Sequence, residues 1–193
     1  VAWRRQKAVT ADVTVKSRMP MGDRNLTARV TGGLTYMRHQ GKPVYRQRLS
    51  TKVEGAEGGE TRLDMVFDGE NLRITTRVAG VRRTVTTEPN LSQGTPPGGA
   101  LLMQVMRAEL TLRVRGEAEV DGADVWVIEG ARKPGAGIPF KRVEVFLDRE
   151  TGFMRLLVMY GDSGEKLAEM RQHNVVFGAS VVPEDILGEE AAS

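Results

Sequence analysis

Apolar and polar residues alternate along most of this chain with the period of two residues that is typical of a β-strand buried on one face. In the first such stretch, Val9, Val13 and Val15 alternate with threonine and charged residues, and the same pattern returns along most of the chain up to residue 177. Asp68-Gly69 and Asp121-Gly122 are dipeptides that favour two-residue hairpin turns. The pattern therefore predicts about eleven strands with mostly short connections, arranged as an antiparallel meander.

The alternation is interrupted once, between residues 89 and 112. The first part of this stretch is rich in proline and glycine, and most residues from 100 onward are apolar. These apolar residues fall at the i, i+3, i+4 and i+7 spacings of a helix, and a helix that is apolar on almost all sides must be buried. Because a sheet of so many twisted strands has to curl, its concave face can bury this helix. We therefore expect a helical insertion over about residues 99 to 110, seated in the sheet as a plug.

The plug has two interpretations. In the first it is a fixed core helix, and in the second it is a movable lid over a lipid-sized cavity. Methionine side chains adapt to irregular apolar ligands, and Met65, Met103 and Met106 would supply them here. Pro96-Pro97-Gly98-Gly99 precedes the helix, either as a hinge or as an ordinary helix-starting loop. On the lid interpretation, the residues expected to contact an apolar ligand are Tyr36, Leu63, Met65, Phe67, Leu72, Ile74, Leu101, Leu102, Met103, Val105, Met106 and Trp126.

Length and charge indicate one domain without a nucleic-acid partner. The chain has 193 residues and a formal net charge of +3, and no charge run or low-complexity linker divides it, so we expect one domain spanning residues 1 to 193. Arg113 and Arg115 alternate with apolar residues and are followed by Glu117 and Glu119, which is typical of a solvated sheet face rather than of a surface that binds nucleic acid. No stretch approaches the roughly 20 apolar residues that a helix needs to cross a bilayer.

Residues for catalytic chemistry are scarce. The chain has no cysteine, which excludes disulfides, thiolate nucleophiles and cysteine metal sites. Its two histidines, His39 and His173, lie in different predicted strands, and neither has a histidine or an acid at the spacing of metal ligands. We therefore expect no metal site, no cofactor and no enzymatic activity.

The late part of the chain carries a more specific pattern. Residues 143 to 156, Val-Glu-Val-Phe-Leu-Asp-Arg-Glu-Thr-Gly-Phe-Met-Arg-Leu, are followed by Tyr-Gly-Asp-Ser-Gly-Glu-Lys at residues 160 to 166. Together with the order of the strands and the apolar insertion after the sixth strand, this stretch resembles the outer-membrane lipoprotein carrier and sorting proteins of the LolA-like superfamily. The resemblance implies a mainly β (α+β) fold, in which the antiparallel sheet curls into an open half-barrel with a helical lid on its concave face.

The resemblance also implies a ligand, a location and one further site residue. The cavity would take up the acyl chain of a lipoprotein or another lipid in the periplasm of a diderm bacterium, with inner- and outer-membrane transfer partners. The first residues, Val1-Ala-Trp-Arg-Arg, are typical of a chain from which an export signal has been removed, and a lipid anchor on the native protein is compatible with this location. Gly33, Arg38, Tyr45 and Arg46 follow the order in which such carriers place an arginine that holds the lid shut. Arg38 is thus the candidate latch, and the alternative is an exposed arginine at a strand end.

Two classes of function remain open. The first is a carrier or binding protein for acyl chains or other lipids, and the second is an envelope-stress sensor or protein-interaction scaffold on the same fold. A continuous open cavity lined by the expected ligand-contacting residues would favour the carrier. A core filled by the protein's own side chains, with an exposed apolar patch elsewhere, would favour the scaffold.

Overall fold

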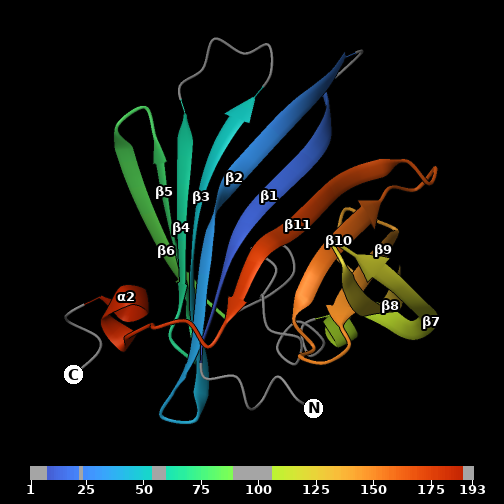
Figure 1. Ribbon diagram of the computed structural model, residues 1–193. Coiled ribbons are helices and arrows are strands. Elements are labelled where there is room, and N and C mark those ends of the chain that lie inside the picture. Colours follow the sequence, from blue (N-terminus) through green and yellow to red (C-terminus); the bar gives the residue numbers. More distant parts are fainter. Residues whose placement is uncertain (1–7, 22–23, 54–59, 89–105, 189–193) are drawn as a thin grey trace.

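The structure, a computed structural model, describes residues 8–21, 24–53, 60–88 and 106–188. Within these ranges, eleven strands form one antiparallel sheet (Figure 1). Each strand contains one of the alternating stretches of the sequence. The strands are β1 (Ala8–Met21), β2 (Arg24–His39), β3 (Lys42–Val53), β4 (Thr61–Phe67), β5 (Leu72–Val78), β6 (Val81–Thr87), β7 (Leu110–Val120), β8 (Ala123–Arg132), β9 (Arg142–Asp148), β10 (Met154–Tyr160) and β11 (Lys166–Phe177).

Across the sheet the strands follow the order β6-β5-β4-β3-β2-β1-β11-β10-β9-β8-β7. Because β6 and β7 stand at the two ends of this order, the sheet is open, and the prediction of a mainly β, open half-barrel is confirmed. The predicted antiparallel meander is present in two parts. β1 pairs with β11, which joins two separate meanders, and the consecutive strands β6 and β7 lie at opposite edges. A local alternation predicts strands, but it does not encode such distant pairings.

The sheet is strongly curled, so that one face is concave and the other is the outer face (Figure 1). Two clusters of buried apolar residues lie on the concave face, and the partly buried Met170 of β11 packs against both. The buried residues of the first cluster are Val9, Ala11, Val13, Leu34, Tyr36, Tyr45, Leu49, Met65, Phe67, Leu72 and Phe153. The buried residues of the second cluster are Met106, Leu110, Ile138, Phe140, Val143, Val145, Leu147, Met154 and Leu157.

Residues 106 to 109 form a helical turn directly before β7. Met106 is completely buried in the second cluster, as expected of a plug residue. The described helical turn ends at residue 109, next to the predicted end at about residue 110, because Leu110 already belongs to β7 and pairs with Arg132 of β8. The remaining plug residues that are expected to contact a ligand lie outside the described residues; they are Leu101, Leu102, Met103 and Val105.

A short helix near the end of the chain, α2 (Pro183–Leu187), is not among the elements that the alternation predicts. Its Ile186 and Leu187 are buried with Val44 of β3 and Val66 of β4 on the outer face. A proline at the first helical position, followed by two acidic residues, is the sequence signal from which this helix could have been expected. α2 therefore covers part of the outer face of β3 and β4.

The stretch that carries the family resemblance includes the turn between β9 and β10, in which Asp148 accepts several hydrogen bonds. Oδ1 of Asp148 accepts hydrogen bonds from the backbone N–H and the hydroxyl of Thr151, both at 2.9 Å. Its Oδ2 accepts a hydrogen bond from Nη2 of Arg155 at 2.8 Å. Burial alone would raise the pKa of Asp148, but the hydrogen bonds from Arg155 and Thr151 hold that pKa below its ordinary value. The Leu-Asp-Arg-Glu-Thr-Gly pattern thus orders this turn.

Candidate functional site

The expected ligand-contacting residues of β2, β4 and β5 gather in the first cluster on the concave face. Inward-facing residues of neighbouring strands stand opposite one another, as Tyr36, Tyr45 and Phe67 do across β2, β3 and β4. The ring centroids of Tyr45 and Phe67 are 5.5 Å apart. Of the expected residues, the structure buries Tyr36, Met65, Phe67 and Leu72 in this cluster and packs the partly buried Leu63 and Ile74 against it.

Two phenol groups enter this apolar surrounding without adding charge to it. Burial raises the pKa of Tyr36 to about 12, against a smaller opposing effect of the positive charge on Arg38. Burial also raises the pKa of Tyr45. Both phenols are therefore neutral at physiological pH, and they contribute no charge to this part of the concave face.

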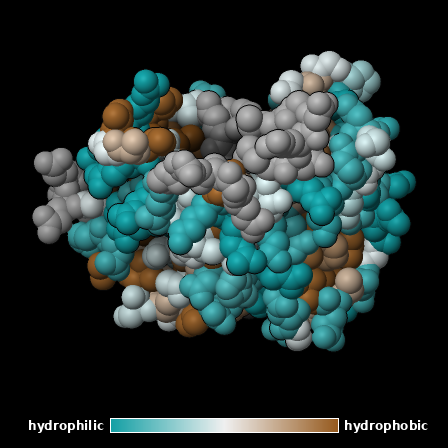
Figure 2. Space-filling view, turned by 90° about the horizontal axis from the view of Figure 1, so that it is seen from above, coloured by the Kyte–Doolittle hydropathy of each residue, from teal (hydrophilic) through white to brown (hydrophobic). Residues whose placement is uncertain are grey.

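The concave face opens toward the edge strand β6. Val78, Val81 and Val85 are 47%, 61% and 58% exposed there, although they occupy inward positions of the alternation. Apolar surface of this kind interrupts a largely hydrophilic exterior (Figure 2). Ile74 lines this opening and also packs against the first cluster, so the exposed apolar surface is continuous with the buried one. The opening is a cavity of about 650 Å³ lined by Ile74, Thr76, Val78, Val81, Arg83 and Val85.

Two glutamines break the apolar pattern of the concave face. Gln47 lies between the inward-facing Tyr45 and Leu49 on β3, and Gln172 of β11 stands opposite Val13 of β1. Each is 1% exposed, and neither amide has a hydrogen-bond partner among the described residues. An unpaired buried amide costs roughly 1 to 3 kcal/mol, so both amides favour a ligand with polar atoms. Gln47 is not among the predicted site residues. The sequence does contain a signal for it, namely a polar residue at an inward position of the strand.

Arg38, the candidate latch, lies at the end of β2. Its Nη2 donates a hydrogen bond to the carbonyl oxygen of Gly41 at 2.6 Å, within the hairpin that joins β2 to β3. Its positive charge also acts on Tyr36 of the same strand. In the described part of the chain, Arg38 thus contacts the hairpin turn, and its role as a latch stays a prediction.

Trp126 lies apart from the other expected ligand-contacting residues. It is on β8 and 40% exposed, and the guanidinium carbon of Arg149 lies 5.0 Å from the centroid of its ring. It lines a mainly polar cavity of about 810 Å³ together with Asp148 and Arg155. The structure therefore does not bring Trp126 to the apolar cavity beside β6.

The two histidines lie on different strands, His39 on β2 and His173 on β11, with β1 between them. Among the described residues, no three histidine, cysteine or acidic side chains come together in a way that could hold a metal ion. In the same part of the chain, no helix has both the length and the apolar character needed to span a bilayer.

Comparison with known proteins identifies the fold. No family model and no curated protein matches the sequence. An uncharacterized conserved protein from Thermus thermophilus matches with a TM-score of 0.52 and 12% identity, over 95% of this chain and 85% of that chain. MucB matches with a TM-score of 0.50 and 17% identity, over 95% of this chain but only 58% of MucB. A putative outer membrane lipoprotein-sorting protein domain from Vibrio parahaemolyticus matches with a TM-score of 0.40 and 10% identity, over 97% of this chain and 92% of that chain. The chain thus has a fold like those of the Thermus thermophilus protein and MucB, and its resemblance to the LolA-like superfamily is one of fold alone.

Proposed function

We propose that this protein is a periplasmic carrier that binds the acyl chain of a lipid or lipoprotein on its concave face. The observation that supports the proposal most strongly is the cavity beside β6. This cavity is open, largely apolar and of the size found in ligand sites, and it is continuous with the first cluster through Ile74. The half-barrel fold and the carrier-like stretch between β9 and β11 support the same function and location.

The energetics of acyl-chain binding set a minimum length for the ligand. Each methylene group gains about 0.8 kcal/mol when it is buried. Association costs at least about 4 kcal/mol in lost translational and rotational freedom. About five methylene groups must therefore be buried before binding becomes favourable. Gln47 and Gln172 do not line this cavity, so their buried amides would bind the ester or carboxyl group only of a ligand that extends from the cavity into the first cluster.

A protein-interaction scaffold is the second candidate, and two observations favour it. The protein's own side chains bury Met65, Phe67 and Leu72, so this part of the concave face is filled. β6 is an edge strand with exposed valines, on which an extended partner segment could add a further strand. MucB, which has a similar fold, has been solved in complex with MucA.

A neutral fluorescent probe of apolar sites, N-phenyl-1-naphthylamine, separates the two candidates. The purified protein should bind it, and the double variant Val81→Asp with Val85→Asp should bind it about tenfold more weakly or worse, because two charges then face the apolar cavity. Val114→Asp is the matched control, since Val114 is 66% exposed on the other edge strand, β7. The control should bind the probe as the parent does.

Two outcomes would reject the carrier. If the parent does not bind the probe, or if Val114→Asp weakens binding as much as the double variant does, the cavity beside β6 is not an acyl site and the scaffold becomes the better proposal. Native mass spectrometry before and after organic extraction adds an independent measurement, because a co-purified lipid appears as a mass difference that extraction removes.

A further inference from the structure

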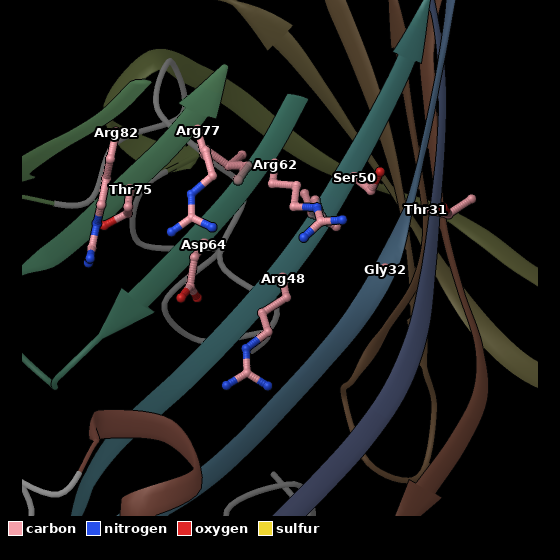
Figure 3. Close-up of a pocket in the computed structure, with 11 residues that line it drawn as sticks. Thr31, Gly32, Arg48, Ser50, Arg62, Asp64, Thr75, Arg77 and Arg82 are labelled. Carbon is pink, nitrogen blue, oxygen red and sulfur yellow. The ribbon is translucent and has the colours of Figure 1, made fainter. Parts of the chain in front are cut away.

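The outer face of β3 to β6 holds a second cavity with a different chemistry. Arg48 lies on the same face of β3 as Val44, which α2 covers, so this cavity lies on the opposite side of the sheet from the proposed acyl site. Figure 3 shows arginine side chains from four strands around it. The volume of the cavity is about 480 Å³, and the polar residues that line it include Arg48, Arg62, Arg77, Arg82, Ser50 and Asp64.

Three of these arginines form one row across the sheet. Arg62 of β4 stands opposite Arg77 of β5, and Arg77 stands opposite Arg82 of β6. The row continues with Ser50 of β3 and Thr31 of β2, which also line the cavity. Like charges at opposite positions destabilise a sheet. Three adjacent positive charges therefore lower the stability of the sheet. Unfavourable arrangements of this kind are expected at functional sites.

The acid inside the cavity does not neutralise this row. Asp64 lines the cavity, but its two oxygens accept hydrogen bonds from Nε and Nη2 of Arg46, at 2.9 Å and 2.5 Å. Among the described residues, Arg48, Arg77 and Arg82 form no ion pair. These three guanidinium groups therefore keep their hydrogen-bond donors available for an external anion.

The other half of the outer face shows how arginines are neutralised elsewhere in this protein. Arg113 and Arg115 each bind the carboxylate of Glu129 at 2.7 Å. Their hydrogen bonds, that of Arg115 first, outweigh the opposing effect of burial and lower the pKa of Glu129. In the arginine row only Arg62 has an acidic partner within the described part of the chain, the exposed Glu60 at 3.1 Å. The row of arginines thus carries an excess of positive charge that its own surroundings do not balance.

We propose that this cavity binds a phosphate group of a phosphate ester. A guanidinium presents its donors in a planar fork that matches two phosphate oxygens, and four arginines line this cavity. The cavity is larger than a bare phosphate requires, so it has room for the group that the phosphate esterifies. Such an ester is either a soluble molecule or the headgroup of a phospholipid. The site lies on the face opposite the acyl cavity and does not depend on the carrier function.

The test measures phosphate binding in two forms. Glycerol 3-phosphate is titrated into the full chain by isothermal titration calorimetry, and phosphatidylcholine vesicles with and without phosphatidylglycerol are sedimented with the protein. The test variant combines Arg77→Gln with Arg82→Gln. The matched control combines Arg107→Gln with Lys141→Gln, which removes the same charge from two exposed residues elsewhere.

Loss of the two guanidinium groups should weaken binding about a hundredfold, roughly tenfold for each, whereas the control should bind nearly as the parent does. Arg77→Lys keeps the charge but loses the fork, so it should also bind clearly more weakly than the parent. Binding of glycerol 3-phosphate identifies a soluble ester as a sufficient ligand, and sedimentation only with phosphatidylglycerol identifies the anionic headgroup of a phospholipid. The affinity for N-phenyl-1-naphthylamine should not change in any of these variants, which separates this site from the acyl site.

Three results would overturn the proposal. The first is equal weakening in the test variant and the control, which would indicate attraction by net charge alone. The second is no binding of either phosphate form by the parent protein. The third is a melting temperature of the test variant below that of the parent, because removal of like charges that have no structural role should leave stability unchanged or raise it.

Discussion

Replacement of the buried Gln47 by methionine should stabilise the fold. Gln47 is 1% exposed, and neither its Nε2 nor its Oε1 has a hydrogen-bond partner among the described residues. Such an amide costs roughly 1 to 3 kcal/mol in an apolar surrounding. Methionine has a similar volume and a flexible shape, so it can fill the same space without large strain. The free energy of unfolding should therefore rise by about 1 to 3 kcal/mol, against a total of about 5 to 15 kcal/mol for a typical domain.

Urea unfolding at neutral pH measures this gain as a shift of the midpoint at constant slope. In a thermal melt, each kcal/mol should raise the melting temperature by about 2 to 4 °C for a chain of this length. Leu34→Met is the matched control, because Leu34 stands opposite Gln47 and belongs to the same cluster. This control exchanges one apolar side chain for another and should cost less than about 1.5 kcal/mol.

A Gln47→Met variant that is less stable than the parent would contradict this expectation, since the amide would then be contributing favourable interactions. The variant also has a functional consequence. It should bind the neutral probe as the parent does but a long-chain fatty acid more weakly, because the carboxyl group loses a hydrogen-bond partner. A polar residue that lowers stability and raises ligand affinity is the trade-off expected of a binding site.

Three further predictions concern the turn, the plug and the latch. Asp148→Asn should lower stability at neutral pH, because the hydrogen bonds from Arg155 keep the pKa of the carboxyl group below its ordinary value. The charged carboxylate stabilises the fold above that ordinary pKa, and this stability is lost as the pH falls through the folded-state pKa. The urea midpoints of parent and variant should therefore converge in acid. Met106→Ala should cost about 2 to 5 kcal/mol, because the residue is fully buried, and together with Leu101→Ala it should raise the affinity for N-phenyl-1-naphthylamine; unchanged affinity would favour a fixed core helix. Arg38→Leu should release a bound lipid more slowly than the parent in a vesicle-transfer assay, and an equal rate would exclude the latch.

The strands and the sorting of residues between the two faces were predictable because both depend on local alternation. Tyr36, Met65 and Phe67 occupy the inward phase, and the structure buries all three in one cluster. The pairing of β1 with β11 was not predictable, because it joins distant parts of the chain. The position of Trp126, apart from the other expected ligand-contacting residues, was not predictable for a related reason. It stands opposite Leu147, which is buried in the second cluster, yet it is 40% exposed, and periodicity contains no information about how far the curl covers each strand.

The arginine row was also missed, although every arginine in it is visible in the sequence. Arg62 and Arg77 alternate with apolar or hydroxyl residues, and this alternation favours the interpretation of a solvated strand face. The row appears only when the register aligns Arg62, Arg77 and Arg82 across three strands. The contrast between this row and the neutralised cluster around Glu129 then depends on side-chain contacts that no sequence pattern describes.

The two proposed sites approach each other at β6, and this has a consequence that can be measured. Val81 and Arg82 are consecutive residues on this edge strand, about 3.3 Å apart along it, yet they belong to the acyl cavity and the phosphate cavity respectively. Because no further strand pairs with β6 within the described sheet, one amphiphilic molecule could pass around this edge and occupy both cavities. A phospholipid would then bind more tightly than a neutral lipid with the same acyl chains, and Arg77→Gln with Arg82→Gln would abolish only that difference. Equal affinities for the two lipids in the parent protein would mean that the sites bind separate molecules, and coupling between them would have to be sought with two ligands present together.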